Sequence, residues 1–320
     1  MLVIGQQAVG PSVGLPETES GARYAMAADI ADVRADLAEC EVVYHYGAPR
    51  DALSANWELT DRLRWVHVAG VGVDWALFPR LVESDVIVTN SRGVFDVTLP
   101  EYLLALMLAL VKDVPGTLRA QASSQWRHRL HEPLAGGRAI ILGAGSIGRS
   151  SARLLRALGM DVTLVGRRER AGGPGGGHIR AVADLHELLP AADWLIVVTP
   201  LTEETRGLIG AAELSLLPGS ARVVNIGRGP VIVESALTEA LRSGALAGAA
   251  LDVFEVEPLP ADSPLWTMPQ VIISPHIGGD VVDTAAAFTN AFLANLQRYI
   301  AGEPLHDIVD KRLGFVAMTG

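Results

Sequence analysis

The sequence feature that most constrains the fold is a series of short runs of aliphatic and β-branched residues that are apolar at nearly every position. Strands of this composition are buried on both faces, which is typical of parallel sheets. Because helical patterns separate the runs, we expect an α/β chain with two parallel sheets. The predicted strands are Val42–Tyr44, Trp65–Val68, Val86–Thr89, Ala139–Leu142, Val162–Val165, Leu195–Val198, Val223–Ile226, Ala249–Asp252 and Val271–Ile273.

Two long helical patterns indicate where the chain passes between domains. The first starts at Thr98-Leu-Pro-Glu101, which has the spacing of a capping box, and continues into the apolar run 103–111. The second covers residues 282–300 and stops before Gly302 and Pro304. If the second helix carries the chain back, residues 1–97 and 283–320 form a discontinuous domain, and residues 98–282 form a domain inserted into it. The glycine-rich stretch 172–177 is predicted to be a flexible loop.

Composition excludes several classes of function. The 320 residues are 49% hydrophobic and carry a formal net charge of -10, which argues against a nucleic-acid partner, because phosphates need a basic surface. A single cysteine, Cys40, can form neither an internal disulfide nor a thiolate metal cluster, and we expect it to be a small buried side chain. No metal site is predicted. The N-terminus has no signal-peptide pattern and the longest apolar run is too short to span a bilayer, so the expected location is cytoplasmic, with no membrane partner.

One strand runs directly into the motif Gly143-x-Gly145-x-x-Gly148, and a helical pattern follows. In a dinucleotide site the first glycine permits a tight turn, the second lets the backbone approach the pyrophosphate, and the third lets helix and strand pack closely. The N–H groups of the helix start, at Ser146 and Ile147, would then face the phosphates. Because a second strand follows at the required distance, we predict a Rossmann-like NAD(P) site here.

The end of that second strand reads Val165-Gly166-Arg167-Arg168, without the acid that would accept the ribose 2′-hydroxyl. The guanidinium groups of Arg167 and Arg168 suit a 2′-phosphate, so the predicted cofactor is NADP in preference to NAD. The alternative is that Arg167 and Arg168 belong to a solvated basic turn at the surface. Glu169, which follows them, is compatible with a 2′-phosphate site and with such a turn.

Three polar segments each follow the carboxyl end of a predicted strand, where open α/β sheets place ligands. Arg228 lies between two glycines and can hold a carboxylate with its bidentate fork. His276 can supply a proton near neutral pH, and a carboxylate such as Glu257 on its other ring nitrogen would favour the protonated form. Taken singly, such residues are more often structural. Together they indicate hydride transfer between a nicotinamide and a small 2-oxo or 2-hydroxy acid.

At these motifs the sequence resembles the D-2-hydroxyacid dehydrogenase family. The resemblance covers most of residues 69–304 and implies Arg228 as substrate binder, His276 as acid/base and Glu257 as its partner. It also implies that the N–H groups of Val71 and Gly72 hold the substrate carboxylate. Further residues that the resemblance places against the cofactor are Thr199, Pro200, Ile226, Asp252 and Gly278. The matching segments are Gly143–Gly148, Thr199–Gly207, Leu217–Gly219, Asn225–Gly229, Asp252–Pro258 and Ser274–Gly279.

Two departures from the family pattern narrow the expected function. Gly166-Arg167 replaces the usual acid, as in NADPH-using glyoxylate/hydroxypyruvate reductases, and Leu99-Pro100 replaces Val-Ala at the start of the long helix. We therefore expect a reductase of small 2-oxo acids. The alternatives are a nucleotide-sensing corepressor-like binding protein and a dehydrogenase of another substrate, such as phosphoglycerate. The phosphoglycerate alternative is disfavoured because the sequence given ends soon after the return helix.

The helix 103–111 is apolar almost all round and has to be covered on every face. Members of the resembled family pair through the cofactor domain. We therefore expect a homodimer, with residues 117–134 as an arm onto the partner.

Overall fold

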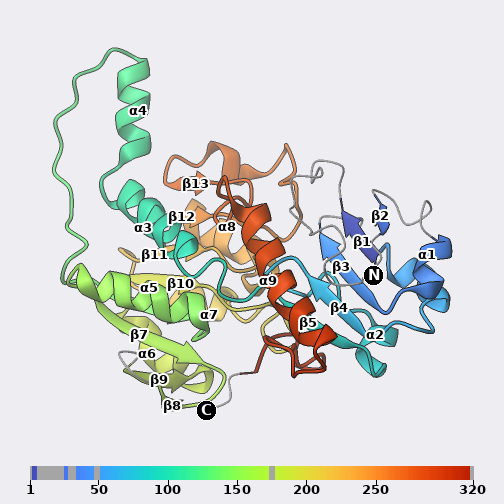
Figure 1. Cartoon of the computed structure of the whole chain (residues 1–320). Helices are drawn as coiled ribbons and strands as arrows, with labels where there is room; N and C mark the ends of the chain where they lie inside the picture. Colours follow the sequence, from blue (N-terminus) through green and yellow to red (C-terminus); the bar gives the residue numbers. More distant parts are fainter. Residues whose placement is uncertain (1, 6–24, 28–33, 47–50, 173–176, 318–320) are drawn as a thin grey trace. The chain divides into compact units, whose positions relative to one another are not determined.

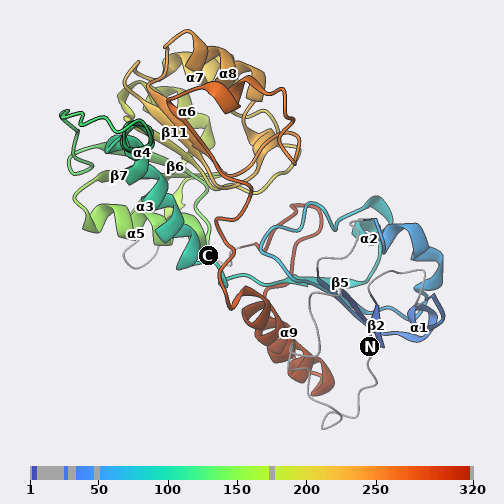
Figure 2. The same ribbon diagram turned by 90° about the horizontal axis from the view of Figure 1, so that it is seen from above.

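The computed structural model describes residues 2–5, 25–27, 34–46, 51–172 and 177–317. The chain divides into two compact units (Figures 1 and 2). Met1–Val94 together with Val281–Gly320 form the split unit, and Phe95–Asp280 form the central unit inserted into it. The predicted fold class, two parallel-sheet α/β domains with one inserted into the other, is confirmed.

The split unit is built on a five-stranded sheet of order β2-β1-β3-β4-β5, in which every pairing is parallel. The strands β1 and β2 were not among those predicted from the sequence. The elements of this unit are β1 (Leu2–Gly5), β2 (Ala25–Ala27), α1 (Arg34–Glu39), β3 (Val42–Tyr46), η3 (Ser54–Leu59), β4 (Trp65–Val68), α2 (Pro79–Glu83), β5 (Ile87–Asn90) and α9 (Thr284–Ile300).

The return helix α9 belongs to the split unit because its aromatic face packs on this sheet. The ring of Phe292, which is fully buried, stacks on Tyr44 at 4.5 Å and on Trp65 at 5.4 Å. Burial of such large rings contributes several kcal/mol, on the order of 1.5–3 per side chain. This packing explains physically why α9, which follows the whole central unit in sequence, completes the split unit.

The central unit contains an eight-stranded sheet of order β13-β12-β11-β10-β6-β7-β9-β8. All pairings are parallel except that of β8 with β9. The strand order reverses at β6, so β6 and β10 flank the crevice where such sheets bind ligands. The strands and helices are α3 (Thr98–Val111), α4 (Val114–Ala122), β6 (Arg138–Leu142), α5 (Ser146–Ala157), β7 (Asp161–Gly166), β8 (Arg170–Ala171), β9 (His178–Ala181), α6 (Leu185–Leu188), β10 (Trp194–Val197), α7 (Ala211–Leu216), β11 (Arg222–Asn225), α8 (Glu234–Arg242), β12 (Gly248–Leu251) and β13 (Val271–Ile273). Short 3-10 turns are η4 (Val182–Asp184), η5 (Leu189–Ala191), η6 (Gly229–Val231) and η7 (Pro264–Thr267).

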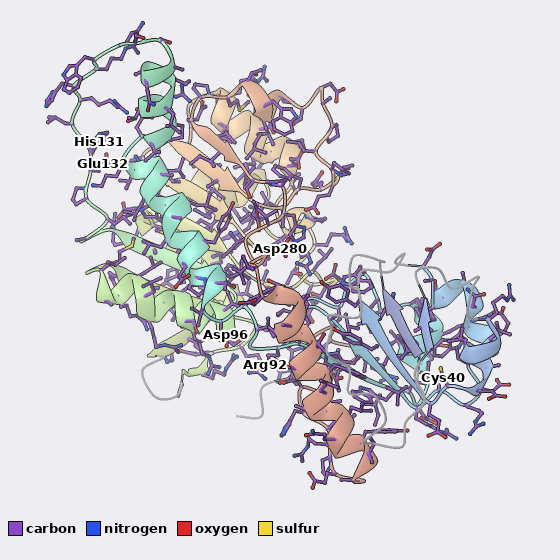
Figure 3. All side chains as sticks on the ribbon, turned by 45° about the horizontal axis from the view of Figure 1, so that its top comes forward. Cys40, Arg92, Asp96, His131, Glu132 and Asp280 are labelled. Atoms are coloured by element: carbon purple, nitrogen blue, oxygen red, sulfur yellow. The ribbon has the colours of Figure 1, made fainter. Side chains whose placement is uncertain are left out.

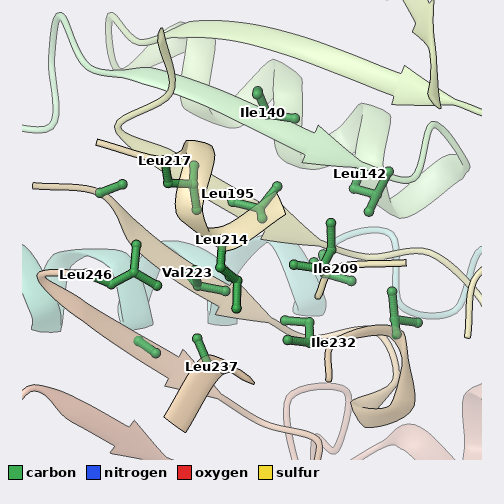
Figure 4. Packing of buried hydrophobic residues seen from close by; sticks show 14 of the residues in the cluster. Ile140, Leu142, Leu195, Ile209, Leu214, Leu217, Val223, Ile232, Leu237 and Leu246 are labelled. Carbon is green, nitrogen blue, oxygen red and sulfur yellow. The ribbon is translucent and has the colours of Figure 1, made fainter. Parts of the chain in front are cut away.

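Both faces of the central sheet are buried, which is why its inner strands are apolar at most positions. On one face Leu195 and Val223 pack with α7 and α8 residues such as Leu214 and Leu237 (Figure 4). On the other face the neighbouring strand positions, such as Ile196, pack against α3 and α5. The helices on the two faces are thus fixed by alternate residues of the same strands.

The start of α3 differs from the sequence prediction. The N-cap is Val97, whose apolar side chain makes no capping bond, and Thr98 already lies inside the helix. The predicted capping box from Thr98 to Glu101 is therefore wrong. The physical reason is that Val97 already has helical dihedral angles and its carbonyl accepts the N–H of Glu101 at 3.2 Å. At the end of α9, Gly302 has φ +70°, as expected for a helix stop.

A long excursion of the central unit follows α3, and it is called the arm here (residues 117–134). Figure 1 shows α4 and the segment after it standing away from the sheet, and Figure 3 labels His131 and Glu132 on that segment. The side chains of Trp126 and Leu130 are 99% and 91% exposed. On α3, Leu108 is also exposed, so the apolar surface of this helix is not fully covered within one chain.

Cys40 is reduced and buried, as expected, between α1 and β3 (Figure 3). Within the described residues, the helices are all too short or too polar to cross a membrane. The central four residues of the glycine-rich stretch, 173–176, lie outside the described residues, so the predicted flexible loop there stays a prediction.

Candidate active site

The glycine motif forms an open cradle at the carboxyl end of β6. Gly143 has φ +121°, and a Cβ there would lie 2.8 Å from the carbonyl carbon of Val198. A Cβ on Gly148 would lie 1.8 Å from the Gly143 oxygen, so only glycine allows α5 to start this close. Gly145, by contrast, is exposed, and a Cβ there would have no neighbour within 4 Å. As the N-cap of α5, Gly145 also leaves the first helical N–H groups without a side-chain cap, so the cradle fits a pyrophosphate.

Two further segments meet this cradle. A Cβ on Gly143 would lie 2.9 Å from the Thr199 nitrogen, and one on Gly227 would lie 3.0 Å from the Thr199 oxygen. The N–H of Ile226 donates to the Val197 carbonyl at 3.1 Å. The structure thus brings together the glycine loop, the start of the Thr199-Pro200 turn and Ile226, all predicted to contact the cofactor.

The end of β7 carries a cluster of basic residues rather than an acid. Arg167 and Arg168 are exposed, and no ion pair holds either guanidinium among the described residues. Glu169 is bound to His178, with Oε1 2.7 Å from Nε2. The sequence analysis missed Arg170, whose Nη1 lies 3.5 Å from the position of a Cβ on Gly166. Pairing of β8 with β9 places it there, and this two-residue strand has no sequence signal of its own.

Two of the predicted catalytic residues are in direct contact. Nδ1 of His276 lies 2.7 Å from Oε2 of Glu257, and Oε1 of the same carboxylate accepts the N–H of Phe254 at 3.0 Å. Burial by itself would raise the pKa of Glu257, but the hydrogen bonds from His276 and Phe254 and the nearby charge of Arg228 hold that pKa below its usual range. The arrangement leaves Nε2 of His276 as the ring nitrogen facing away from Glu257.

The loop that carries Arg228 is held by Asn225. The Asn225 amide oxygen accepts the N–H of Gly227 at 3.0 Å, and its Nδ2 donates to the Arg228 carbonyl at 3.0 Å. A Cβ on Gly229 would lie 1.9 Å from the Phe254 backbone. Both glycines that flank Arg228 are buried. Close approach to neighbouring backbone requires these glycines.

Asp252 fastens the loop that carries His276. Its side chain is 2% exposed; Oδ1 accepts the Ser274 hydroxyl at 2.5 Å and the Ile277 N–H at 3.0 Å, and Oδ2 accepts the Gly278 N–H at 2.9 Å. A role of Asp252 and Gly278 in cofactor binding stays a prediction. The sequence analysis named Ser274 only within a motif, and neither Ser274 nor Asn225 was predicted as a site residue.

The split unit contains a candidate carboxylate-binding loop of its own. The loop after β4 is fixed by Asn90, whose Nδ2 donates to the Val71 carbonyl at 2.6 Å. In the described part of the chain, the N–H groups of Val71 and Gly72 donate to no protein acceptor. Two adjacent amides of this kind can hold a carboxylate. In the same unit, the Trp75 ring packs edge-on against the His45 ring, with 4.8 Å between the two ring centroids.

Comparison with known proteins gives a consistent result. Residues 104–278 match the model of the D-isomer specific 2-hydroxyacid dehydrogenase NAD binding domain. The chain is 36% identical over 262 residues to a glyoxylate/hydroxypyruvate reductase B from Pectobacterium carotovorum, covering 79% of this chain and 80% of the relative. It is 32% identical over 258 residues to the D-3-phosphoglycerate dehydrogenase of Methanocaldococcus jannaschii, covering 79% of this chain but 48% of the relative, so the chain spans about half the length of that protein.

Among solved structures, the chain resembles an NADPH-dependent glyoxylate/hydroxypyruvate reductase from Sinorhizobium meliloti in complex with NADP and sulfate. The TM-score is 0.84 at 27% identity, covering 98% of this chain and 99% of the other.

Proposed function

Because the chain belongs to the D-isomer specific 2-hydroxyacid dehydrogenase family, we propose that it reduces small 2-oxo acids of the glyoxylate/hydroxypyruvate type to D-2-hydroxy acids, with NADPH as hydride donor. The observation that carries the proposal is the His276–Glu257 contact of 2.7 Å, with the charge of Arg228 acting on the same carboxylate. A proton donor, its anionic partner and a cation for the substrate are the groups that reduction of a 2-oxo acid requires.

Each of the three residues has a separate task. Arg228 holds the substrate carboxylate and polarises the ketone oxygen, because its guanidinium offers paired donors. His276 gives the proton on Nε2 to the oxygen that becomes the alcohol, and Glu257 stabilises the imidazolium before that transfer. A nicotinamide, when bound, would supply the hydride.

We propose a separate binding role for each unit. The cofactor would lie on the central unit, with its pyrophosphate at Gly143–Gly148 and with Thr199, Pro200, Ile226 and Gly278 beside the remaining parts. The substrate carboxylate would also bind the N–H groups of Val71 and Gly72 in the split unit. We assign residues 98–282 to the cofactor domain and residues 1–97 with 283–320 to the substrate domain.

Preference for NADPH over NADH is part of the proposal. It is supported by Gly166, which stands where the family usually has an acid, so that no carboxylate there accepts from the ribose 2′-hydroxyl or repels a 2′-phosphate. It is also supported by three arginines near Gly166, which are Arg167, Arg168 and Arg170. A charge-assisted hydrogen bond to a 2′-phosphate contributes about 1.5–3 kcal/mol. At about 1.4 kcal/mol per decade, even one such bond gives roughly tenfold discrimination.

We also propose a homodimer in which the arm contacts the partner. An aromatic and a leucine side chain exposed at 99% and 91% are costly to leave in water, and the exposed part of α3 lies in the same unit.

The test is a set of initial rates for glyoxylate, hydroxypyruvate, pyruvate and 3-phosphohydroxypyruvate with each cofactor. Acetone serves as the ketone without a carboxylate and should not be reduced, because it offers Arg228 no carboxylate to bind. Tight NADPH binding without reduction of any 2-oxo acid would contradict the proposal and favour a corepressor-like binding protein. Preference for 3-phosphohydroxypyruvate would instead favour a phosphoglycerate dehydrogenase.

A further inference from the structure

A chain of hydrogen bonds links α3 to the loop that carries His276. The Tyr102 hydroxyl lies 2.5 Å from the Ser274 hydroxyl, and Ser274 lies 2.5 Å from Oδ1 of Asp252. We propose that Tyr102 and Ser274 are positioning residues that hold His276, through Asp252, in the orientation needed to give its proton. This inference rests on the proposed function, in which His276 is the proton donor.

The donor and acceptor in each of these hydrogen bonds follow from the last group, Asp252. The carboxylate of Asp252 can only accept, so Ser274 must donate its one hydroxyl hydrogen to it. Tyr102 must then donate to the oxygen of Ser274. Each donor polarises the next, and the chain ends on an anion, where hydrogen bonds are strongest.

Asp252 holds the backbone on both sides of His276. Ser274 lies two residues before His276, and the two amides bonded to Asp252, those of Ile277 and Gly278, come directly after it. His276 itself has φ +56°, in the left-handed region, which is strained for a residue with a side chain. Such a conformation persists only where the surroundings enforce it. A single carboxylate therefore supports the strained residue, and Tyr102 and Ser274 keep that carboxylate in place.

The ring of Tyr102 has a second, separable contact. A Cβ on Gly278 would lie 2.8 Å from Cδ1 of Tyr102 and 3.1 Å from Leu99, and one on Gly279 would lie 2.7 Å from the Phe95 ring. The first turn of α3 and the residues before it thus form a wall against the Ile277–Gly279 turn. Removing only the hydroxyl of Tyr102 leaves this wall intact, so the hydrogen bond can be tested without disturbing the packing.

The first experiment measures kcat and the two KM values of Tyr102→Phe, Ser274→Ala, the double variant and Ser274→Thr. Tyr102→Phe should lower kcat about three- to tenfold, the fold-change that one neutral hydrogen bond gives, with KM for NADPH within about twofold of wild type. Ser274→Ala should lower kcat further, and the double variant should equal Ser274→Ala, because Tyr102 acts through Ser274. Ser274→Thr keeps the hydroxyl and should restore kcat to within about threefold of wild type.

The second experiment needs no cofactor. Amide hydrogen exchange at Ile277 and Gly278 should be about tenfold faster or more in Tyr102→Phe and in Ser274→Ala, and unchanged in Tyr299→Phe, a matched loss of a hydroxyl in α9 of the split unit. Tyr299→Phe should also keep the wild-type kcat.

Several results would overturn the inference while leaving the function intact. These are a wild-type kcat in Tyr102→Phe, a loss expressed in KM alone, additive effects in the double variant, or a kcat loss with unchanged amide exchange. Absence of 2-oxo acid reduction in the wild type would contradict the function, and the exchange comparison would still decide whether Tyr102 and Ser274 hold the loop.

Discussion

Nδ1 of His276 and Oε2 of Glu257 lie 2.7 Å apart, although the two residues are 19 positions apart in sequence. The contact fixes the imidazole with Nε2 directed away from Glu257, because Nδ1 donates to the carboxylate. Glu257 stays ionised to lower pH than an ordinary glutamate, since its pKa is lowered. Glu257 is therefore a charged partner of His276 at neutral pH and remains so further into the acidic range than an ordinary glutamate would.

His276→Ala should lower the rate of 2-oxo acid reduction by about a hundredfold or more, the usual contribution of a positioned acid, with little change in NADPH affinity. Glu257→Gln should also lower the rate, since a neutral amide does not stabilise the imidazolium that gives the proton. Steady-state rates and NADPH affinities check both variants. A His276→Ala rate within about threefold of wild type would refute the assignment.

Arg167→Ala and Arg170→Ala should each lower kcat/KM for NADPH about tenfold and leave kcat/KM for NADH nearly unchanged, because only NADPH has the 2′-phosphate. The control is Arg312→Ala, an exposed arginine in the split unit. Equal efficiencies with the two cofactors in the wild type would mean that these arginines are surface charge only. A loss of kcat/KM for NADPH in Arg167→Ala but not in Arg170→Ala would show that Arg170 does not bind the 2′-phosphate.

Light scattering at micromolar concentration should give the mass of a dimer for the wild type and of a monomer for Trp126→Ser combined with Leu130→Ser. The two side chains are the most exposed apolar groups of the arm, and their burial would contribute about 1.5–3 kcal/mol each. Leu158→Ser, which changes a leucine 41% exposed at the end of α5, should stay dimeric. A monomeric wild type contradicts the dimer, and a dimeric double variant contradicts the role of the arm.

Because His67 is buried, we expect the split unit to lose folding stability as the pH falls. Burial lowers the pKa of His67 from 6.5 to about 3, while its ring bonds Thr89 at 2.8 Å and Ser91 at 3.1 Å. Between these pH values the unfolded chain binds a proton that the folded chain does not. The stability that His67 contributes is therefore complete above pH 6.5 and falls as pH drops, by up to about 1.4 kcal/mol per pH unit. The free energy of unfolding in urea, measured across that pH range, should depend less steeply on pH in His67→Gln than in the wild type. In the exposed control His128→Gln, its dependence on pH should be that of the wild type. Identical slopes in wild type and His67→Gln would contradict this account.

Lys311 ties the C-terminal segment to the split unit. Its Nζ donates to the carbonyls of Leu81 at 2.9 Å, Ser84 at 2.5 Å and Val86 at 2.9 Å, and burial lowers its pKa. Lys311→Met keeps the aliphatic stem but leaves the carbonyls without this donor, so the free energy of unfolding should fall by about 1.5–3 kcal/mol. The neighbouring Arg312→Ala should change it by less than about 0.5 kcal/mol. Equal stability of the two variants would show that the three contacts contribute little.

The sequence by itself determined the elements whose pattern is local. Trp65–Val68 and Val271–Ile273 are strands with the predicted bounds, because a buried parallel strand is apolar at most of its positions. The glycine motif was equally readable, since the turn, the approach of a phosphate and the helix packing each demand glycine at a fixed spacing.

Only the tertiary structure decided which distant side chains meet. The bond from Tyr102 to Ser274 joins residues 172 positions apart, and Asp252 reaches Ile277 and Gly278 from another strand end. Arg170 comes near Gly166 through a strand pair of two residues, too short to leave a periodic pattern. Val97 replaced Thr98 as the cap of α3 because the helix began one residue earlier than its capping pattern indicated. Hydrogen bonds of this kind depend on where folded segments come together, and a one-dimensional pattern contains the donors and acceptors but not their distances.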